Sequence, residues 1–176
     1  MKNLVLVGFM GSGKTVVGRR LAAQLGMEFC DCDQLIEQRT GRRISDIFAR
    51  EGEAFFRQLE RALVRELAAG SRRVIATGGG VVLNPENLRD LSATGIIICL
   101  WAEPEVLLQR LQHDTDRPLL AGTDREKKLR ELLAQRAPLY RAIPLCVDTT
   151  RLTIEQTVQA VHELYRQHAG NGTDTR

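Results

Sequence analysis

The chain has 176 residues, of which 43 % are hydrophobic, and it carries a formal net charge of +3 with both signs interspersed. This length predicts one compact domain that buries about 70 % of its unfolded surface. The charge bias is too small to indicate a nucleic-acid partner, and no apolar run approaches the roughly 20 residues that a membrane span needs.

The first predicted element is a strand over Asn3–Val7. Met1-Lys2 runs straight into it without the layout of a signal peptide, so we expect a cytoplasmic protein. A helix is predicted over Lys14–Leu25, where apolar residues recur on one face. The segment between them is therefore a loop that joins a strand to a helix.

That loop reads Gly8-Phe9-Met10-Gly11-Ser12-Gly13-Lys14-Thr15 and matches the phosphate-binding pattern G-x-x-x-x-G-K-[ST]. In this motif the backbone N–H groups and the positive end of the following helix face phosphate oxygens. Lys14 would reach the β- and γ-phosphates of a nucleotide, and the Thr15 hydroxyl would ligate Mg²⁺. The alternative is a glycine-rich turn that only resembles the pattern.

A second strand is predicted over Met27–Cys32, and Asp31-Cys32-Asp33 ends it. Because residues two apart on a strand share a face, both carboxylates would point to one side. One could hold metal-bound water while the other accepts a hydroxyl proton. The alternative is a solvated acidic turn at the start of the next helix.

Helices follow. One is predicted over Gln34–Arg39 and ends at Gly41, a second is capped by Ser45 and runs to about Arg50, and a third covers Glu53–Ala69. The apolar stripe of the third helix is Phe55, Leu59, Leu63 and Leu67. By pattern alone, Arg57 is one more exposed helical arginine.

The third strand, Arg73–Thr77, runs into Gly78-Gly79-Gly80. Three glycines permit a close approach of the backbone to a ligand, although a flexible connector would have the same composition. Asn84-Pro85 predicts a helix start, with a cap residue followed by proline. The apolar run Ile96–Trp101 predicts the fourth strand.

A helix is predicted from Pro104 to about Gln112, and another from Asp124 to Gln135, ending before Pro138. The polar segment between them, about 112–124, is predicted to be a lid that closes over ATP with Arg117 on the phosphates. The alternative is an ordinary surface loop. Arg136 is, by pattern, another exposed helical arginine.

The C-terminal part contains a fifth strand over Leu145–Val147 and a helix that starts at the capping box Thr153–Gln156 and runs to about Gln167. We predict one domain over residues 1–168 and a disordered polar tail over 169–176. The cysteines show no metal spacing, and we expect small buried side chains rather than disulfides at Cys30, Cys32, Cys99 and Cys146.

Strands alternating with helices predict an α/β fold, with a parallel sheet covered on both faces. In such sheets, ligands bind beyond the carboxyl ends of the strands. That rule places Gly8–Thr15, Asp31–Asp33 and Thr77–Gly80 together at one edge.

With these segments assembled, the chain resembles the shikimate kinases. The resemblance covers about residues 3–165 and lies in Gly-Phe-Met-Gly-Ser-Gly-Lys-Thr (8–15), Asp-Cys-Asp (31–33), Ile-Glu-Gln-Arg-Thr-Gly (36–41), Phe-Arg (56–57), Gly-Gly-Gly (78–80), Arg-Pro-Leu-Leu (117–120) and Arg-Ala-Pro-Leu-Tyr (136–140). It implies a three-layer α/β/α P-loop kinase fold with a five-stranded parallel sheet and a lid loop.

The resemblance also implies a role for each matching residue. Shikimate would be bound by Asp33, Arg57, Gly79, Gly80 and Arg136, with the two arginines gripping its carboxylate. ATP would be bound by Gly11, Ser12, Gly13, Lys14, Thr15, Val16, Arg110 and Arg117. Mg²⁺ would be held by Thr15 directly and by Asp31 through water. The catalytic groups would be Lys14, Asp33 and Arg117, and the reaction would be transfer of the γ-phosphoryl group of ATP to the shikimate 3-hydroxyl.

One wall of the adenine pocket, near Arg151–Ile154, departs from the proline-containing version of some members of the family. Other small-molecule kinases of gluconate or nucleoside monophosphates stay open as alternatives. A nucleotide-dependent switch is a further alternative, although no Asn-Lys-x-Asp motif is present. The last is a non-catalytic regulator descended from a kinase. We expect a monomer, because no exposed heptad or long apolar surface stripe is evident.

Overall fold

The computed structural model describes residues 1–111 and 124–170 and contains a five-stranded parallel sheet. The strand order is β2-β3-β1-β4-β5, so every connection crosses from one strand to a parallel one. The strands are β1 (Asn3–Gly8), β2 (Glu28–Asp31), β3 (Arg73–Ala76), β4 (Gly95–Trp101) and β5 (Cys146–Asp148). β1 is central, and Leu4 is in register with Val74 on one side and Ile96 on the other.

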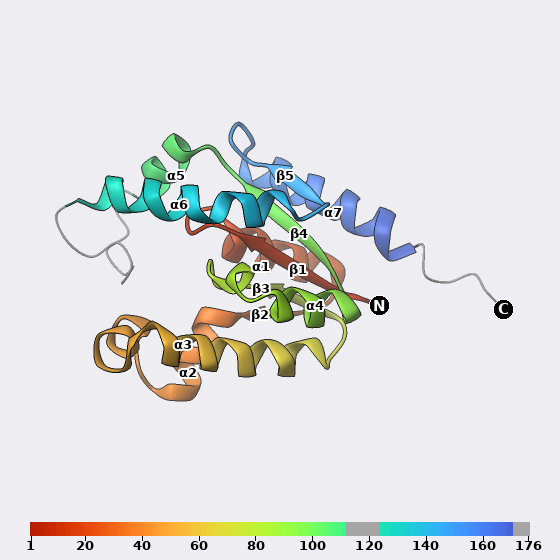
Figure 1. Cartoon of the computed structure of the whole chain (residues 1–176). Coiled ribbons are helices and arrows are strands. Elements are labelled where there is room, and N and C mark those ends of the chain that lie inside the picture. The colour runs from red at the N-terminus through yellow and green to blue at the C-terminus, as the bar shows by residue number, and fades with distance from the viewer. Residues whose placement is uncertain (112–123, 171–176) are drawn as a thin grey trace.

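Helices cover both faces of this sheet (Figure 1). They are α1 (Lys14–Leu25), α2 (Cys32–Thr40), α3 (Ile44–Ala68), α4 (Pro85–Thr94), α5 (Pro104–Leu111), α6 (Arg125–Arg141) and α7 (Ile154–Ala169), with a 3₁₀ turn η1 (Val81–Leu83). None of the described helices is both long enough and apolar enough to cross a membrane.

The alternation of side chains along β1 produces two cores. Leu4 and Leu6 pack in a cluster with α1 and α7 on one face. Val5 and Val7 pack on the other face in a cluster to which α2, α3, α4, α5 and α6 contribute. The fold is therefore the expected three-layer α/β/α arrangement, and the carboxyl ends of β1, β2 and β3 lie at one edge.

Helix α3 differs from the prediction at its start. It begins at Ile44, so Ser45 lies inside it and is not the cap, and the Ile44 N–H donates to Glu37 Oε1 at 2.9 Å instead. The two predicted helices are joined into one element that is broken at Gly52, whose φ of 82° is non-helical. The glycine thus marks a kink where a boundary was expected.

Helix α6 also runs further than predicted, to Arg141, with Pro138 inside it. A proline there costs one backbone hydrogen bond. The last turn is nevertheless secured, because Tyr140 is buried and the Ala142 N–H donates to the Pro138 carbonyl at 3.1 Å. Packing of this turn outweighs the helix-breaking tendency of the proline.

One prediction about the cysteines is wrong. Cys30, Cys32 and Cys99 are buried, but Cys146 is exposed because it starts the short edge strand β5. At the C-terminal end, α7 includes Ala169, and residues 171–176 of the predicted tail lie outside the described residues.

Candidate active site

The phosphate loop connects β1 to α1 and depends on a glycine at its first position. Gly8 has a φ of 152°, and a Cβ there would lie only 2.4 Å from the Leu100 carbonyl oxygen. Glycine is therefore the residue that allows the loop to leave the sheet beside β4. The loop delivers Gly11, Gly13, Lys14, Thr15 and Val16 to one pocket at the sheet edge.

Lys14 starts α1, and its side chain curls back under this loop. Its Nζ donates to the Gly8 carbonyl at 2.8 Å and the Phe9 carbonyl at 3.0 Å, and the residue is 9 % exposed. The loop thus holds a positive charge at the positive end of a helix, where an anion is favoured. Ser12 lies deeper, its hydroxyl 3.4 Å from Lys14 Nζ and its N–H donating to the Phe9 carbonyl.

A hydroxyl and a carboxylate meet across the same pocket. Thr15 Oγ1 donates to Asp31 Oδ2 at 2.7 Å, and both residues line the pocket with Lys14. Asp31 also caps α2, because its Oδ1 accepts from the Gln34 N–H at 3.2 Å. The residues described include no group of three or more His, Cys, Asp or Glu side chains arranged around a metal site.

The acidic pair is arranged differently from the prediction. β2 ends at Asp31 and α2 begins at Cys32, so Asp31 and Asp33 do not share one face of a strand. The helix turn still brings Asp33 to the sheet edge, where it lines the pocket of Lys14 and also a neighbouring pocket. Both carboxylates therefore line the pocket at the sheet edge, as expected, but a helix turn and not a shared strand face brings them there.

The neighbouring pocket has walls from three parts of the chain. α3 contributes Phe48, Phe56, Arg57 and Glu60, α6 contributes Arg136, and the triple glycine contributes Gly78, Gly79 and Gly80. The two arginines are 79 positions apart and come together because α3 and α6 pack on the same face of the sheet. Neither is an ordinary exposed helical arginine, since Arg136 is 4 % exposed and the Arg57 side chain 23 %.

Arg57 is held in place by two carboxylates on its own helix. Its NH1 lies 2.8 Å from Glu60 Oε2, and its NH2 lies 2.8 Å from Glu53 Oε1. The guanidinium also lies against the backbone of Gly80, where a Cβ would be 2.3 Å from both terminal nitrogens. The triple glycine therefore makes room for the arginine as well as exposing backbone.

Glu60 is a site residue that the sequence prediction missed. It is 2 % exposed, and its Oε1 has no hydrogen-bond partner among the described residues. Burial raises the pKa of Glu60 above its ordinary value, although Arg57 acts in the opposite direction. The available signal was a glutamate in the buried stripe of α3, because Phe56, Glu60, Leu63 and Leu67 all face inward.

Tyr140 is a second residue whose position the sequence did not indicate. Its hydroxyl donates to the Gly79 carbonyl, and its ring packs edge-on against Phe9 with centroids 6.3 Å apart. Burial raises the pKa of Tyr140, so the hydroxyl keeps its proton for this hydrogen bond. Tyr140 thus links α6 to both the triple glycine and the phosphate loop.

The two pockets adjoin, because Met10, Asp33, Ile44 and Gly79 line both. Arg110 on α5 lines the pocket of Lys14, and its guanidinium donates to Thr149 Oγ1 at 3.2 Å and to the Thr149 carbonyl at 2.9 Å. Near Arg151–Ile154, the predicted capping box is present, with Thr153 and Gln156 exchanging hydrogen bonds. Arg117 and segment 112–123 of the predicted lid lie outside the described residues.

The family model for shikimate kinase matches residues 10–166. The chain belongs to the shikimate kinase family. A shikimate kinase of Thermodesulfovibrio yellowstonii is 44 % identical over 173 residues, which cover 98 % of this chain and 100 % of the relative. Another from Caldanaerobacter subterraneus is 47 % identical over 165 residues, 94 % of this chain and 96 % of the relative.

Solved structures of the shikimate kinase family agree with this fold. The Acinetobacter baumannii enzyme in complex with shikimate superposes with a TM-score of 0.89 at 39 % identity, covering 99 % of this chain and 96 % of that one. The Aquifex aeolicus enzyme superposes at 0.79 with 32 % identity, covering 97 % and 98 %. A gluconokinase from Sinorhizobium meliloti, at 17 % identity and a TM-score of 0.59 over 97 % and 98 %, shares the fold alone.

Proposed function

We propose that this protein transfers the γ-phosphoryl group of ATP to the 3-hydroxyl of shikimate, giving shikimate 3-phosphate and ADP. The observation that carries the proposal is the shared wall of the two pockets. One pocket has the P-loop groups of a phosphate donor site, the other has an arginine pair, and Asp33 and Gly79 line both. A donor and an acceptor bound there would face each other across Asp33.

The pocket of Lys14 is the proposed nucleotide site. Loop backbone, Lys14 and the N-terminus of α1 would bind the phosphates, and the Lys14 charge would stabilise the transferring group. Gly11, Ser12, Gly13 and Val16 complete the proposed phosphate contacts, and Arg110 would lie beside the adenine. Arg117 is proposed to reach the phosphates from the lid, as the family resemblance implies.

Magnesium is the implied metal, and the donor set fits it. Thr15 Oγ1 and Asp31 Oδ2 are oxygen atoms 2.7 Å apart in the nucleotide pocket, and Mg²⁺ needs only one or two protein oxygens beside phosphates and water. Thr15 would hold the ion directly and Asp31 through water. When bound, Mg²⁺ neutralises negative charge on the phosphates.

The arginine pocket is the proposed acceptor site. Arg57 and Arg136 would bind the shikimate carboxylate, a planar anion that suits their forked donors. The backbone of Gly79 and Gly80 would lie against the acceptor, and Asp33 would hydrogen-bond its hydroxyls and accept the proton of the attacking one. Positioning of the two substrates would provide much of the acceleration.

A coupled assay for ADP tests the proposal. With ATP present, the purified protein should release ADP when shikimate is added, but not when gluconate or a nucleoside monophosphate is added. The result separates the main alternatives, because ADP release with gluconate would indicate a different kinase. A nucleotide switch or a non-catalytic regulator would release no additional ADP with any of these acceptors. Absence of shikimate-dependent ADP would refute the proposal.

Two substitutions test the assigned roles. Lys14→Met should abolish turnover. Arg57→Ala should raise the shikimate KM by about 10- to 100-fold, as expected for a lost charge-assisted contact, while the ATP KM stays within about twofold. Arg65→Ala, an exposed arginine on the same helix, is the matched control and should leave both constants unchanged. Gel filtration tests the further expectation of a monomer.

A further inference from the structure

The triple glycine lies in the acceptor pocket but has no side chains with which to hold its own position. Internally, the Val81 N–H donates to the Gly78 carbonyl at 3.2 Å and the Leu83 N–H to the Gly80 carbonyl at 3.0 Å. These bonds define the turn of η1 but do not fix where the turn sits. The position of the turn must be fixed by neighbouring side chains, because glycine allows a wider range of backbone conformations than any other residue.

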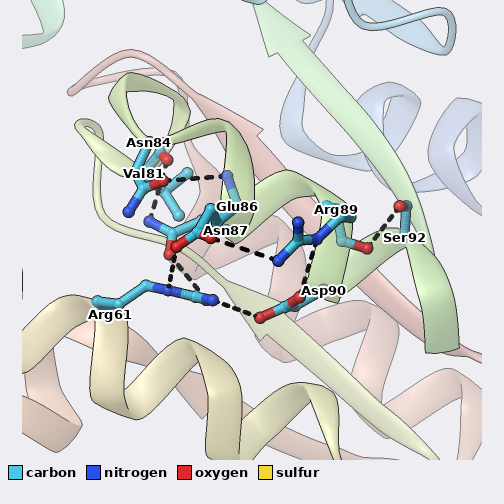
Figure 2. Close-up of polar contacts among 8 residues, drawn as sticks. All are labelled: Arg61, Val81, Asn84, Glu86, Asn87, Arg89, Asp90 and Ser92. Atoms are coloured by element: carbon cyan, nitrogen blue, oxygen red, sulfur yellow. Dashed lines mark hydrogen bonds and ion pairs between the residues drawn. The ribbon is translucent and has the colours of Figure 1, made fainter.

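Asn87 supplies such a contact from the first turns of α4. It is 1 % exposed, and its Nδ2 donates to the Val81 carbonyl at 3.2 Å. Figure 2 shows the Asn87 side chain lying between Val81 and Arg61, with a contact to each. Since Val81 follows Gly80 directly, the amide of Asn87 holds the residue next to the acceptor pocket.

The other end of the same amide contacts α3. Arg61 NH1 donates to Asn87 Oδ1 at 3.4 Å, and Arg61 NH2 forms an ion pair with Asp90 Oδ2 at 2.7 Å (Figure 2). Arg61 lies one helical turn after Arg57 and next to Glu60. Asn87 therefore contacts both the residue that directly follows the triple glycine and the helix that carries Arg57.

The glycine backbone and the Arg57 side chain leave little space between them. A Cβ at Gly80 would lie 2.3 Å from the Arg57 guanidinium, so the backbone and the arginine already approach closely. A change in the position of Val81 would alter this spacing directly. Asn87 itself lines neither of the two pockets.

We propose that Asn87 is a positioning residue for the acceptor pocket, holding the Gly79–Gly80 backbone at its distance from Arg57 through the Val81 carbonyl. This inference rests on the proposed function, because it assigns the acceptor to that pocket. A residue that merely stabilises α4 would behave differently. Its replacement would lower the stability of the protein without changing the shikimate KM more than the ATP KM.

The test is Asn87→Asp, which keeps the shape of the side chain but removes the Nδ2 donor. Loss of one hydrogen bond corresponds to about a three- to tenfold change, and we expect a rise of that size in the shikimate KM, with the ATP KM within about twofold. Hydrogen exchange should also accelerate at the Val81 and Leu83 amides. Asn87→Ser, which is smaller and uncharged, serves as the second variant if Asn87→Asp fails to fold.

The matched control is Asp90→Asn. It removes the shorter of the two ion pairs that Arg61 makes with α4, leaving the pair with Glu86 at 3.5 Å and the bond from Asn87 to Val81 in place. Its melting temperature should fall while the shikimate KM and the two exchange rates stay near wild type. An unchanged shikimate KM in the Asn87 variants, or equal rises in both KM values, would overturn the inference.

The wild type reports separately on the proposed function. If it did not phosphorylate shikimate, the proposed reaction would be refuted whatever the variants did. The exchange measurement would then decide whether Asn87 positions the glycine backbone. Unchanged protection of Val81 and Leu83 in Asn87→Asp would refute that role.

Discussion

Replacing Gly80 with alanine tests how closely the glycine backbone approaches Arg57. Gly80 has a φ of −99°, which alanine also adopts, so the substitution adds a methyl group without backbone strain. That methyl carbon would lie 2.3 Å from each terminal nitrogen of Arg57 and 2.4 Å from its Cζ. Ordinary contact would require the guanidinium to retreat by about 1 Å.

The guanidinium does not retreat freely, because Glu53 and Glu60 each hold it at 2.8 Å. A displaced guanidinium loses its charge-assisted contact with the acceptor carboxylate, which corresponds to about 10- to 100-fold in binding. We therefore expect Gly80→Ala to raise the shikimate KM by about 10- to 100-fold. The ATP KM should stay within about twofold, because Gly80 does not line the nucleotide pocket.

A double-mutant cycle with Arg57→Ala makes the test specific. If the methyl acts only by displacing Arg57, the double variant should bind shikimate no worse than Arg57→Ala alone. Steady-state kinetics of the four proteins, with shikimate and ATP varied separately, measure this. Gly170→Ala, with no atom within 4 Å of the added carbon, is the control. Additive losses, or an unchanged KM in Gly80→Ala, would refute the proposed approach of backbone and arginine.

Three further predictions concern single side chains. Burial raises the pKa of Glu60 above 4.5, so above that pH the native state keeps a proton that the unfolded state loses, and the free energy of unfolding should fall as the pH rises. Urea titrations at several pH values should show a flatter pH dependence of this free energy in Glu60→Gln, and an identical dependence would contradict the prediction. A hydrogen bond from the Cys99 thiol lowers the pKa of the exposed Cys146 to about 7, so the rate of alkylation by iodoacetamide should be half-maximal near that pH. The rapid alkylation should disappear in Cys146→Ser, and its persistence in that variant would contradict the prediction. Tyr140→Phe loses the hydrogen bond to the Gly79 carbonyl and should raise the shikimate KM about threefold to tenfold, whereas a change only in melting temperature would indicate a purely structural role.

The parts of the site that the sequence predicted are those encoded by local patterns. The P-loop has a fixed spacing, and the rule for strand ends places it beside Asp31–Asp33 and the triple glycine. The strands and most helices follow from apolar periodicity and end signals such as Asn84-Pro85. These features depend on neighbours along the chain, which a sequence displays directly.

The remaining parts depend on packing between distant segments. Periodicity treats a helical glutamate as exposed, so Glu60 was overlooked although α3 turns it inward toward Arg57. Arg57 and Arg136 could be paired only through resemblance to the family, because nothing local connects α3 with α6. Pro138 remained inside α6 because burial of Tyr140 secures the last turn. In each case, tertiary contacts overrode or redirected a local preference.

The wall that the two pockets have in common links the affinities of their occupants. Any adjustment of Asp33 or Gly79 that accompanies binding in one pocket changes the surface offered to the other. Thermodynamic reciprocity then requires that a nucleotide change the affinity for shikimate by the same factor as shikimate changes the affinity for the nucleotide. The ratio of the shikimate dissociation constants without and with nucleotide must therefore equal the ratio of the nucleotide dissociation constants without and with shikimate.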